Sequence, residues 1–228
     1  MEKRYERNVP AISEQECRLL RSKRVAVIGC GGIGGYLIEL LARLGVGYIR
    51  AVDGDVFEES NLNRQLLSEQ ALLGRSKVKA AEARVQRIDP DIKLEPVSAY
   101  IDKDNAVELI SDCDLVMDGL DNIYARRILA AACAEADLPC IHGAISGWVA
   151  QAAVSMPGDG LIDILYPEVS SIHDRSVLSF VPSLCASVQT ALAVKMLLGR
   201  PVDTGTLYYF DLLDQDLEKL KLDPGLGK

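Results

Sequence analysis

The chain has 228 residues, of which 49% are apolar and 25% are charged, a composition typical of a soluble globular protein. Its formal charge of −8 argues against a nucleic-acid partner, because nucleic acids usually bind a basic face. The sequence shows neither a signal peptide after its basic start nor an uninterrupted apolar segment approaching a membrane span. We therefore expect a cytoplasmic protein that does not bind membranes.

The N-terminal region combines a charged segment with a short predicted helix. Ser13 and Glu16 form a capping-box pattern at the start of an amphipathic helix over Ser13–Ser22. The preceding segment Glu2–Arg7 is mostly charged, which by itself is typical of a solvated, frayed terminus.

A glycine-rich turn joins the first predicted strand to a helix. The β-branched run Val25–Ile28 predicts a buried parallel strand, and the helical pattern Tyr36–Leu44 follows the turn. The G-x-G-x-x-G spacing between them allows a tight turn, close approach of a phosphate and close helix packing, through Gly29, Gly31 and Gly34, with Gly32 beside them. The pattern predicts a nucleotide site, although a turn that only packs helix on strand is the alternative. It leaves open which nucleotide binds there.

An acidic turn follows the second predicted strand, Tyr48–Val52. This strand ends in Asp53-Gly54-Asp55, and an acidic residue about twenty positions beyond the glycine loop usually binds a ribose hydroxyl. We therefore expect Asp53 and Asp55 to lie at the nucleotide site.

A polar connection then carries charged residues close behind the glycine loop. Asn61, Arg64 and Gln65 cluster at helical spacing, and Lys77 follows in a predicted helix, Ser76–Ile88, that Ser76 caps. An arginine fork and a lysine point charge suit a polyphosphate, although each residue singly is also typical of a solvated helix face.

The fourth predicted strand, Asp114–Asp118, is followed by another carboxylate. Asp121 lies just past the strand end, at the edge where open α/β sheets bind ligands, and a carboxylate there suits Mg²⁺. The alternative role at this position is to cap the helix Asn122–Asp137, and Asp121 and Asn122 can divide the two roles between them.

The remaining elements set the predicted fold class. Strands and helices alternate as in a Rossmann-like, doubly wound parallel sheet, and the later strands predict an antiparallel C-terminal extension. We expect one domain over residues 1–228, with a nucleotide-binding half at about 23–145 and a mixed-sheet part at about 146–228. The further predicted elements are Lys93–Ala99, Asp102–Ser111, Pro139–Ala144, Trp148–Met156 with a turn leading to Leu161–Leu165, Pro182–Leu198, Thr206–Leu212 and Asp216–Leu222.

Few side chains suggest acid–base or covalent chemistry. The polar stretch Tyr166–Phe180 lacks periodicity and is typical of a lid or binding loop, and it contains His173. We expect His142, at a strand end, to be structural. No Ser-His-Asp or Cys-His arrangement supports covalent hydrolysis.

The order of these motifs resembles the MoeB/ThiF/HesA family, the bacterial relatives of ubiquitin-activating enzymes. GCGGIGG, D-x-D, N-x-x-R-Q, G-x-x-K and D-x-x-D-N follow one another, and the resemblance runs from Arg4 to about Gly225. Five spaced motifs are far more specific than the glycine loop alone. Ordinary dinucleotide dehydrogenases do not carry Asn61-x-x-Arg64-Gln65 with Lys77 behind it.

The resemblance implies an ATP-dependent adenylyltransferase that activates a carboxylate with ATP and Mg²⁺. The glycine loop, Asp53 and Asp55 would bind the nucleotide, and Asp121 would hold Mg²⁺ with Asn122 beside it. The resemblance also implies that the triphosphate is surrounded by Asn61, Arg64, Gln65 and Lys77. The family's R-Y-x-R motif, here Arg4–Arg7, implies that Arg7 reaches the phosphates across a homodimer interface.

The acceptor that the resemblance implies is the C-terminal Gly-Gly carboxylate of a ubiquitin-like sulfur-carrier protein of the molybdopterin or thiamin type. Two alternatives stay open: adenylation of a small-molecule or peptide carboxylate, and a nucleotide-binding sensor or NAD-dependent dehydrogenase. The sequence names neither the carrier nor the sulfur donor.

The cysteines depart from the family pattern. The six cysteines include no C-x-x-C pair, whereas many members bind zinc through two such pairs, which would fall near Leu165–Ser170 and after Gly225. We therefore predict no zinc site. The family's crossover-loop cysteine is replaced by residues near Asp174. Cys185, at a helix start, is expected to be a packing residue, with a reactive thiol as the alternative.

Overall fold

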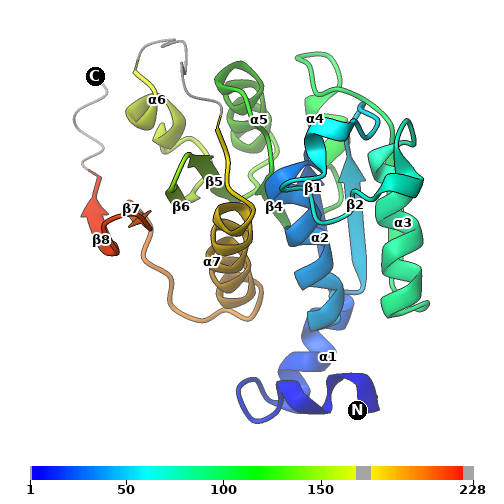
Figure 1. The fold of residues 1–228 in the computed structure, drawn as a ribbon. Helices are drawn as coiled ribbons and strands as arrows, with labels where there is room; N and C mark the ends of the chain where they lie inside the picture. Colours follow the sequence, from blue (N-terminus) through cyan, green and yellow to red (C-terminus); the bar gives the residue numbers. More distant parts are fainter. Residues whose placement is uncertain (1, 168–175, 223–228) are drawn as a thin grey trace.

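The computed structural model describes residues 2–167 and 176–222. A mixed eight-stranded sheet runs through it in the order β3-β2-β1-β4-β5-β6-β7-β8 (Figure 1). Neighbouring strands are parallel from β3 to β5 and antiparallel from β5 to β8, which confirms the predicted fold class. The strands are β1 (Arg24–Ile28), β2 (Tyr48–Val52), β3 (Lys93–Val97), β4 (Leu115–Asp118), β5 (Cys140–Ser146), β6 (Val149–Ser155), β7 (Thr206–Asp211) and β8 (Asp216–Lys221).

Helices cover both faces of the parallel strands. One face packs against α2, α3 and α7, and the other packs against α4 and α5. The helices are η1 (Lys3–Asn8), α1 (Glu14–Ser22), α2 (Gly32–Leu44), η2 (Glu59–Asn61), η3 (Gln70–Leu72), α3 (Lys77–Ile88), α4 (Ala106–Ile110), α5 (Ile123–Glu135), α6 (Leu161–Leu165) and α7 (Phe180–Leu197).

The two-residue period of β1 supplies both cores. Val25 and Val27 belong to the α2-side cluster, whereas Ala26 and Ile28 belong to the α4-side cluster. All four side chains are at most 1% exposed, and burying a side chain such as valine or isoleucine stabilises a fold by about 1.5–3 kcal/mol. The order of the strands reverses between β1 and β4, and open α/β sheets bind ligands beside such a reversal.

Three local predictions differ from the structure. The helix predicted over Asp102–Ser111 is only Ala106–Ile110, because the Asp102 carboxylate accepts backbone N–H groups in a turn before it. Leu161–Leu165, expected to return from the turn after the strand Trp148–Met156, is instead a short helix. It begins after Gly160, which has φ +69°, and its first side chains are buried. Ser76 precedes α3 as expected, but its hydroxyl is buried without a hydrogen bond and does not cap the helix.

The long helix α7 is a core element. By length and composition it is apolar enough to cross a membrane, yet half of it is buried. It packs against α2, β5 and β6, so its apolar surface is used inside the fold. It begins at Phe180, two residues before the predicted start at Pro182, which lies in its first turn where proline is tolerated.

The N-terminal segment is ordered rather than frayed. The Tyr5 side chain is 7% exposed and its hydroxyl donates to Asp89, a fully buried carboxylate at the C-terminal end of α3. Arg4 and Arg21 donate to the same carboxylate at 2.7 and 2.8 Å. The predicted capping box of Ser13 is confirmed. These contacts fix η1 at one end of the molecule.

Candidate active site

The glycine loop is pressed against the turn that follows β4. Gly29 has φ +90°, and a Cβ built on it would lie 2.6 Å from the carbonyl oxygen of Gly119. A Cβ on Gly34 would lie 1.8 Å from the carbonyl oxygen of Gly29, so no larger residue fits while α2 begins where it does. The expected tight turn and close helix packing at these two positions are confirmed. The approach of a phosphate to Gly31 stays a prediction.

Asp53 clamps the glycine loop to the end of β2. Its Oδ2 accepts the backbone N–H of Cys30 at 2.7 Å, and its Oδ1 accepts the N–H of Asp55 at 2.8 Å. A carboxylate has about four lone-pair sites, so both oxygens can still accept hydrogen bonds from ribose hydroxyls. The structure thus gives Asp53 a structural task that is compatible with the predicted binding one.

Asp55 and Lys77 form an ion pair in an open pocket. Lys77 Nζ lies 2.8 Å from Asp55 Oδ2, and the Tyr100 hydroxyl donates to Oδ1 at 2.6 Å. Partial burial opposes ionisation of Asp55, but these two donors outweigh it and lower the pKa of the carboxyl. The pocket has a volume of about 300 Å³ and is also lined by Glu58 and Asn61.

Tyr100 is a pocket residue that the motif analysis missed. It follows β3 by three residues, at the same edge of the sheet as Asp53. Its ring covers Gly54, where a Cβ would lie 2.7 Å from the ring. The strand-end rule that singled out Asp53 and Asp121 also applies after the third strand and could have found it.

Asn61, Arg64 and Gln65 lie between the pocket and the glycine loop. Asn61 and Gln65 are buried, and Asn61 Oδ1 accepts the backbone N–H of Glu58. A Cβ on Gly31 would meet Gln65 Nε2 at 3.6 Å, and one on Gly32 would meet Arg64 Cγ at 3.9 Å. The structure therefore brings the N-x-x-R-Q motif onto the loop.

The arrangement fits a nucleotide such as ATP. Gln65 Oε1 is buried without a hydrogen-bond partner beside Gly31, and such a group needs a donor from a ligand or water. Within the described residues, Arg64 donates only to neutral oxygens, those of Ser60 and Asn63, so its charge remains to be matched by an anion. Lys77, 5% exposed, supplies a second positive charge.

Asn122 takes the helix-capping role, and the Mg²⁺ role of Asp121 stays a prediction. Asn122 Oδ1 caps α5 by accepting the N–H of Ala125 at 2.8 Å. Asp121 is exposed. Within the described residues, its carboxylate accepts one hydrogen bond, from the Asn122 amide at 3.4 Å. An exposed carboxylate oxygen at this edge fits Mg²⁺, which takes one or two carboxylates and fills its other positions with phosphate and water.

A buried group of charged residues stands directly behind Asp121. Asp118 Oδ2 lies 2.7 Å from His142 Nδ1 and 3.2 Å from Arg126 Nε, and all three residues are at most 4% exposed. Burial opposes ionisation of Asp118, but the Arg126 charge and the His142 hydrogen bond outweigh it and lower its pKa. His142 is thus structural, as predicted. The D-x-x-D-N motif contained Asp118, but sequence alone could not tell that it is buried.

Cys185 is a packing residue. It lies within α7, fully buried, and burial raises the pKa of its thiol to about 12. Its burial and raised pKa favour the packing role over the reactive-thiol alternative, because the thiolate is disfavoured at neutral pH. All six cysteines are free thiols.

The predicted metal and loop residues lie partly outside the described part of the chain. In residues 2–167 and 176–222, the one cluster of possible metal ligands is Glu2, Asp89 and Asp91, next to Arg4 and Arg21. The absence of zinc stays a prediction. His173, Asp174 and most of the stretch Tyr166–Phe180 lie outside the described residues, as does the segment after Gly225.

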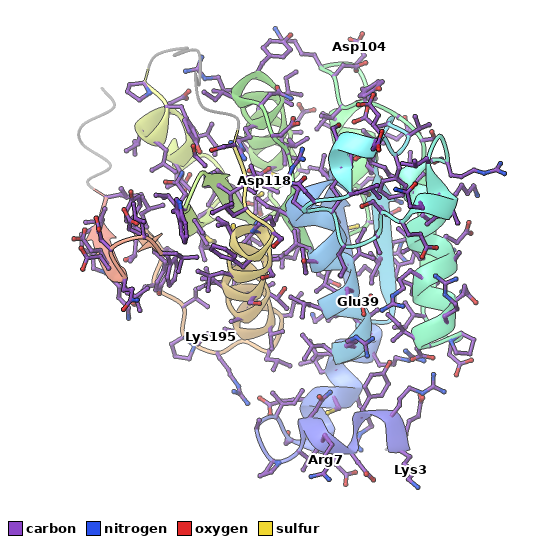
Figure 2. The ribbon with its side chains drawn as sticks, viewed as in Figure 1. Lys3, Arg7, Glu39, Asp104, Asp118 and Lys195 are labelled. Carbon is purple, nitrogen blue, oxygen red and sulfur yellow. The ribbon has the colours of Figure 1, made fainter. Side chains whose placement is uncertain are left out.

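Arg7 does not join the other candidates within one chain. It is exposed on η1, at the bottom end of the molecule, whereas Asp118 lies in its central part (Figure 2). Tyr5 packs against Gly45 at the C-terminal end of α2, whereas the glycine loop is at its start. Thirteen helical residues span about 20 Å, so Arg7 lies far from the pocket of its own chain.

A protein-family model matches almost the whole chain. The model of the ThiF family matches residues 5–225. The chain belongs to the ThiF family. This confirms the resemblance that the five motifs indicated.

Three proteins are similar to this chain over most of its length. The SAMP-activating enzyme E1 of Haloferax volcanii is 37% identical over 213 residues, which cover 90% of this chain and 78% of the relative. The molybdopterin-synthase adenylyltransferase of Escherichia coli K12 is 33% identical over 218 residues, covering 90% and 86%. The probable adenylyltransferase/sulfurtransferase MoeZ of Mycobacterium tuberculosis H37Rv is 34% identical over 241 residues, but this chain spans only 62% of its length.

A solved structure shows the same fold. The crystal structure of E. coli MccB with ATP superposes with a TM-score of 0.82 at 19% identity, covering 97% of this chain and 72% of MccB. At this low identity the likeness bears on the fold alone.

Proposed function

We propose that this ThiF-family chain is an ATP-dependent adenylyltransferase that activates the C-terminal carboxylate of a ubiquitin-like sulfur-carrier protein as an acyl-adenylate. The observation that carries the proposal is that Lys77 and Asn61 line an open pocket next to the glycine loop, while Gln65 lies against Gly31 of that loop. The names of the archaeal and E. coli relatives support it, since both denote activating or adenylylating enzymes.

The chemistry needs positioning and charge neutralisation rather than a protein nucleophile. A carboxylate oxygen attacks the α-phosphorus of ATP, the bond from that phosphorus to the bridging oxygen breaks, and pyrophosphate leaves with the electron pair. The attacking carboxylate is already ionised at neutral pH, so no general base is required. Arg64 and Lys77 would stabilise the charge that develops on the phosphates.

The other site residues bind the substrates. Asp53 and Asp55 would hold the ribose end of the nucleotide, and the Asn61 and Gln65 amides would contact it near the glycine loop. Mg²⁺, held by Asp121, would neutralise phosphate charge when bound. Lys77 would exchange its partner Asp55 for a phosphate when ATP enters, because phosphate carries the larger negative charge.

The proposal includes a cytoplasmic homodimer in which Arg7 serves the site of the partner subunit. Arg7 is exposed and lies about a helix length from its own pocket, and the Tyr5–Asp89 hydrogen bond anchors its segment to the fold. An exposed arginine on an anchored segment far from its own site fits a contribution in trans.

Pyrophosphate exchange into ATP tests the function. We expect exchange that depends on a carrier protein ending in Gly-Gly, and loss of exchange in Arg64→Ala and Asp121→Ala proteins that remain folded. Exchange driven only by small acids or peptides would move the substrate to that alternative. NAD binding without ATP binding would refute adenylation altogether.

A mixing experiment tests the contribution in trans. Arg7→Ala and Asp121→Ala proteins, each inactive alone, should regain part of the activity when their subunits exchange, because one mixed site then holds both residues. Labelled subunits establish that exchange has occurred. Persistent inactivity in mixed dimers would refute the placement of Arg7.

A further inference from the structure

The Asp121 carboxylate is exposed, but each residue around it is held in place. The N–H of Gly119 donates to the Ile28 carbonyl at 2.9 Å, and its Cα packs against Gly29 and Gly34. Asn122 is held as the cap of α5. The remaining neighbour, Leu120, has no regular secondary structure to hold it, so its backbone groups need other partners.

Both backbone groups of Leu120 are held by the buried pair, which we define as Asp118 and Arg126. Asp118 Oδ1 accepts the Leu120 N–H at 2.9 Å, and Arg126 Nη2 donates to the Leu120 carbonyl. The same Nη2 donates to the Gly143 carbonyl at 3.0 Å, which ties the loop to β5. A charge-assisted hydrogen bond is roughly twice as strong as a neutral one, and here two of them hold one residue.

His142 and Tyr166 complete this arrangement with one consistent set of donors. Burial lowers the pKa of His142, so its imidazole is neutral at neutral pH and carries one proton. Asp118 only accepts, so that proton is on His142 Nδ1 and Nε2 is an acceptor. The Tyr166 hydroxyl, 3.2 Å from Nε2, is then its donor, and the same hydroxyl accepts from Gln151 Nε2 at 3.0 Å. The charges of Asp118 and Arg126 balance each other.

The Tyr166 ring also packs against the buried residues Arg126 and His142. The Arg126 guanidinium lies 5.7 Å from the centre of the Tyr166 ring, and the ring meets His142 edge-on at 5.8 Å. The Tyr166 carbonyl accepts from Arg127 Nη2 at 2.7 Å, so the tyrosine is held at its backbone as well as at its hydroxyl.

We propose that His142 and Tyr166 are positioning residues which, through the buried pair Asp118 and Arg126, fix Leu120 and so aim the Asp121 carboxylate at the metal and phosphates. This inference rests on the proposed adenylyltransferase function. It assigns a task to residues that touch neither substrate nor metal. Partners behind a metal ligand commonly change metal affinity by about 10- to 100-fold when they are removed.

The test compares variants that keep or remove the donor to Asp118. His142→Asn keeps an N–H near the position of Nδ1, His142→Leu removes it, and Tyr166→Phe removes only the hydroxyl. Glu39→Gln is the matched control, because it weakens a buried carboxylate that pairs with Arg84 between α2 and α3, away from the loop. Only variants that circular dichroism shows to be fully folded are compared.

Two measurements are needed: hydrogen exchange of the Leu120 amide, and Mn²⁺ affinity of the protein with a non-hydrolysable ATP analogue, followed by electron paramagnetic resonance. We expect His142→Leu to bind Mn²⁺ about tenfold more weakly and to exchange Leu120 faster. Tyr166→Phe should show a smaller change in the same direction. His142→Asn keeps the donor to Asp118 but loses the Tyr166 contact, so it should match Tyr166→Phe. Glu39→Gln should match the wild type.

The outcomes separate this inference from the proposed function. Unchanged Mn²⁺ affinity in folded His142→Leu and Tyr166→Phe proteins, or equal weakening in Glu39→Gln, overturns the positioning role. The inference also fails if Asp121→Asn does not weaken Mn²⁺ binding. A wild-type protein that binds Mn²⁺ with the nucleotide as expected but never exchanges pyrophosphate contradicts the adenylyltransferase function and leaves the positioning result standing.

Discussion

Two carboxylate–cation pairs lie at ends of the central strands, and they differ in their exposure to solvent. The open pair, Asp55 and Lys77, follows β2, and the Asp55 side chain is 47% exposed. In the buried pair, Asp118 at the end of β4 and Arg126, the side chains are 2% and 4% exposed. Both carboxyl groups have lowered pKa values, because a cation and further donors outweigh the cost of their burial.

This difference in exposure suits the two pairs to the different roles proposed for them. A cation whose partner is half exposed can exchange that partner for an incoming phosphate at small cost, because water solvates the carboxylate left behind. A buried pair cannot separate without leaving an uncompensated charge inside the protein. The open pair is therefore suited to contact ATP, and the buried pair is suited to hold the loop that carries Asp121.

The largest expected effect is on stability at the buried pair. Arg126→Met leaves Asp118 ionised and unpaired in the interior, so the free energy of unfolding should fall by about 3–5 kcal/mol. Denaturant unfolding monitored by circular dichroism measures it. A loss below about 1 kcal/mol would mean that the pair is solvated like the open one, and the comparison would fail.

At the open pair, we expect a substitution to lower activity strongly and stability only slightly. Lys77→Met should lower pyrophosphate exchange by about 10²–10³-fold, the usual loss when a charge-stabilising group is removed, with a much smaller stability change. Lys79→Met, on the exposed face of the same helix, is the control and should keep full exchange. Equal losses in both variants would point to helix α3 rather than to the pocket.

Acid should destabilise the buried region through His142, which faces Asp118, Arg126 and Tyr166. Burial lowers the pKa of His142 and outweighs the opposing effect of Asp118. Stability from the neutral ring is complete above the unfolded pKa of about 6.5 and is lost as the pH falls towards the native pKa, by up to about 1.4 kcal/mol per pH unit. Urea unfolding at about pH 7, 6 and 5 should show this slope in the wild type and a reduced one in His142→Asn. Identical slopes in both proteins would contradict it.

The smallest effect is expected at Tyr100, which shares Asp55 with Lys77. Tyr100→Phe removes one hydrogen bond to a half-exposed carboxylate, worth on the order of 1 kcal/mol or less. The KM for ATP should change by less than about tenfold, with kcat nearly unchanged. A large loss of kcat instead would show that Tyr100 contacts the reacting phosphates.

The local patterns of the sequence were sufficient for most of the fold and for naming the candidate site residues. Strand period, glycine spacing and carboxylates behind strands depend on residues close in sequence, so Gly29, Asp53 and Asp121 could be singled out. The same rules predicted too long a helix at Asp102–Ser111, because side-chain hydrogen bonds to the backbone compete with helix formation there.

What only the tertiary structure decided is burial and long-range partnership. Asp118 and His142 are 24 positions apart, and Asp55 and Tyr100 are 45 apart, so no short pattern joins them. Asp118 and Asp121 belong to one motif with identical side chains, yet one is buried against Arg126 and the other is open to ligand. The packing of β4, α5 and β5 around Asp118 determines this difference in burial. Burial matters because the ionisation and the partners of a carboxylate depend on whether water or protein surrounds it.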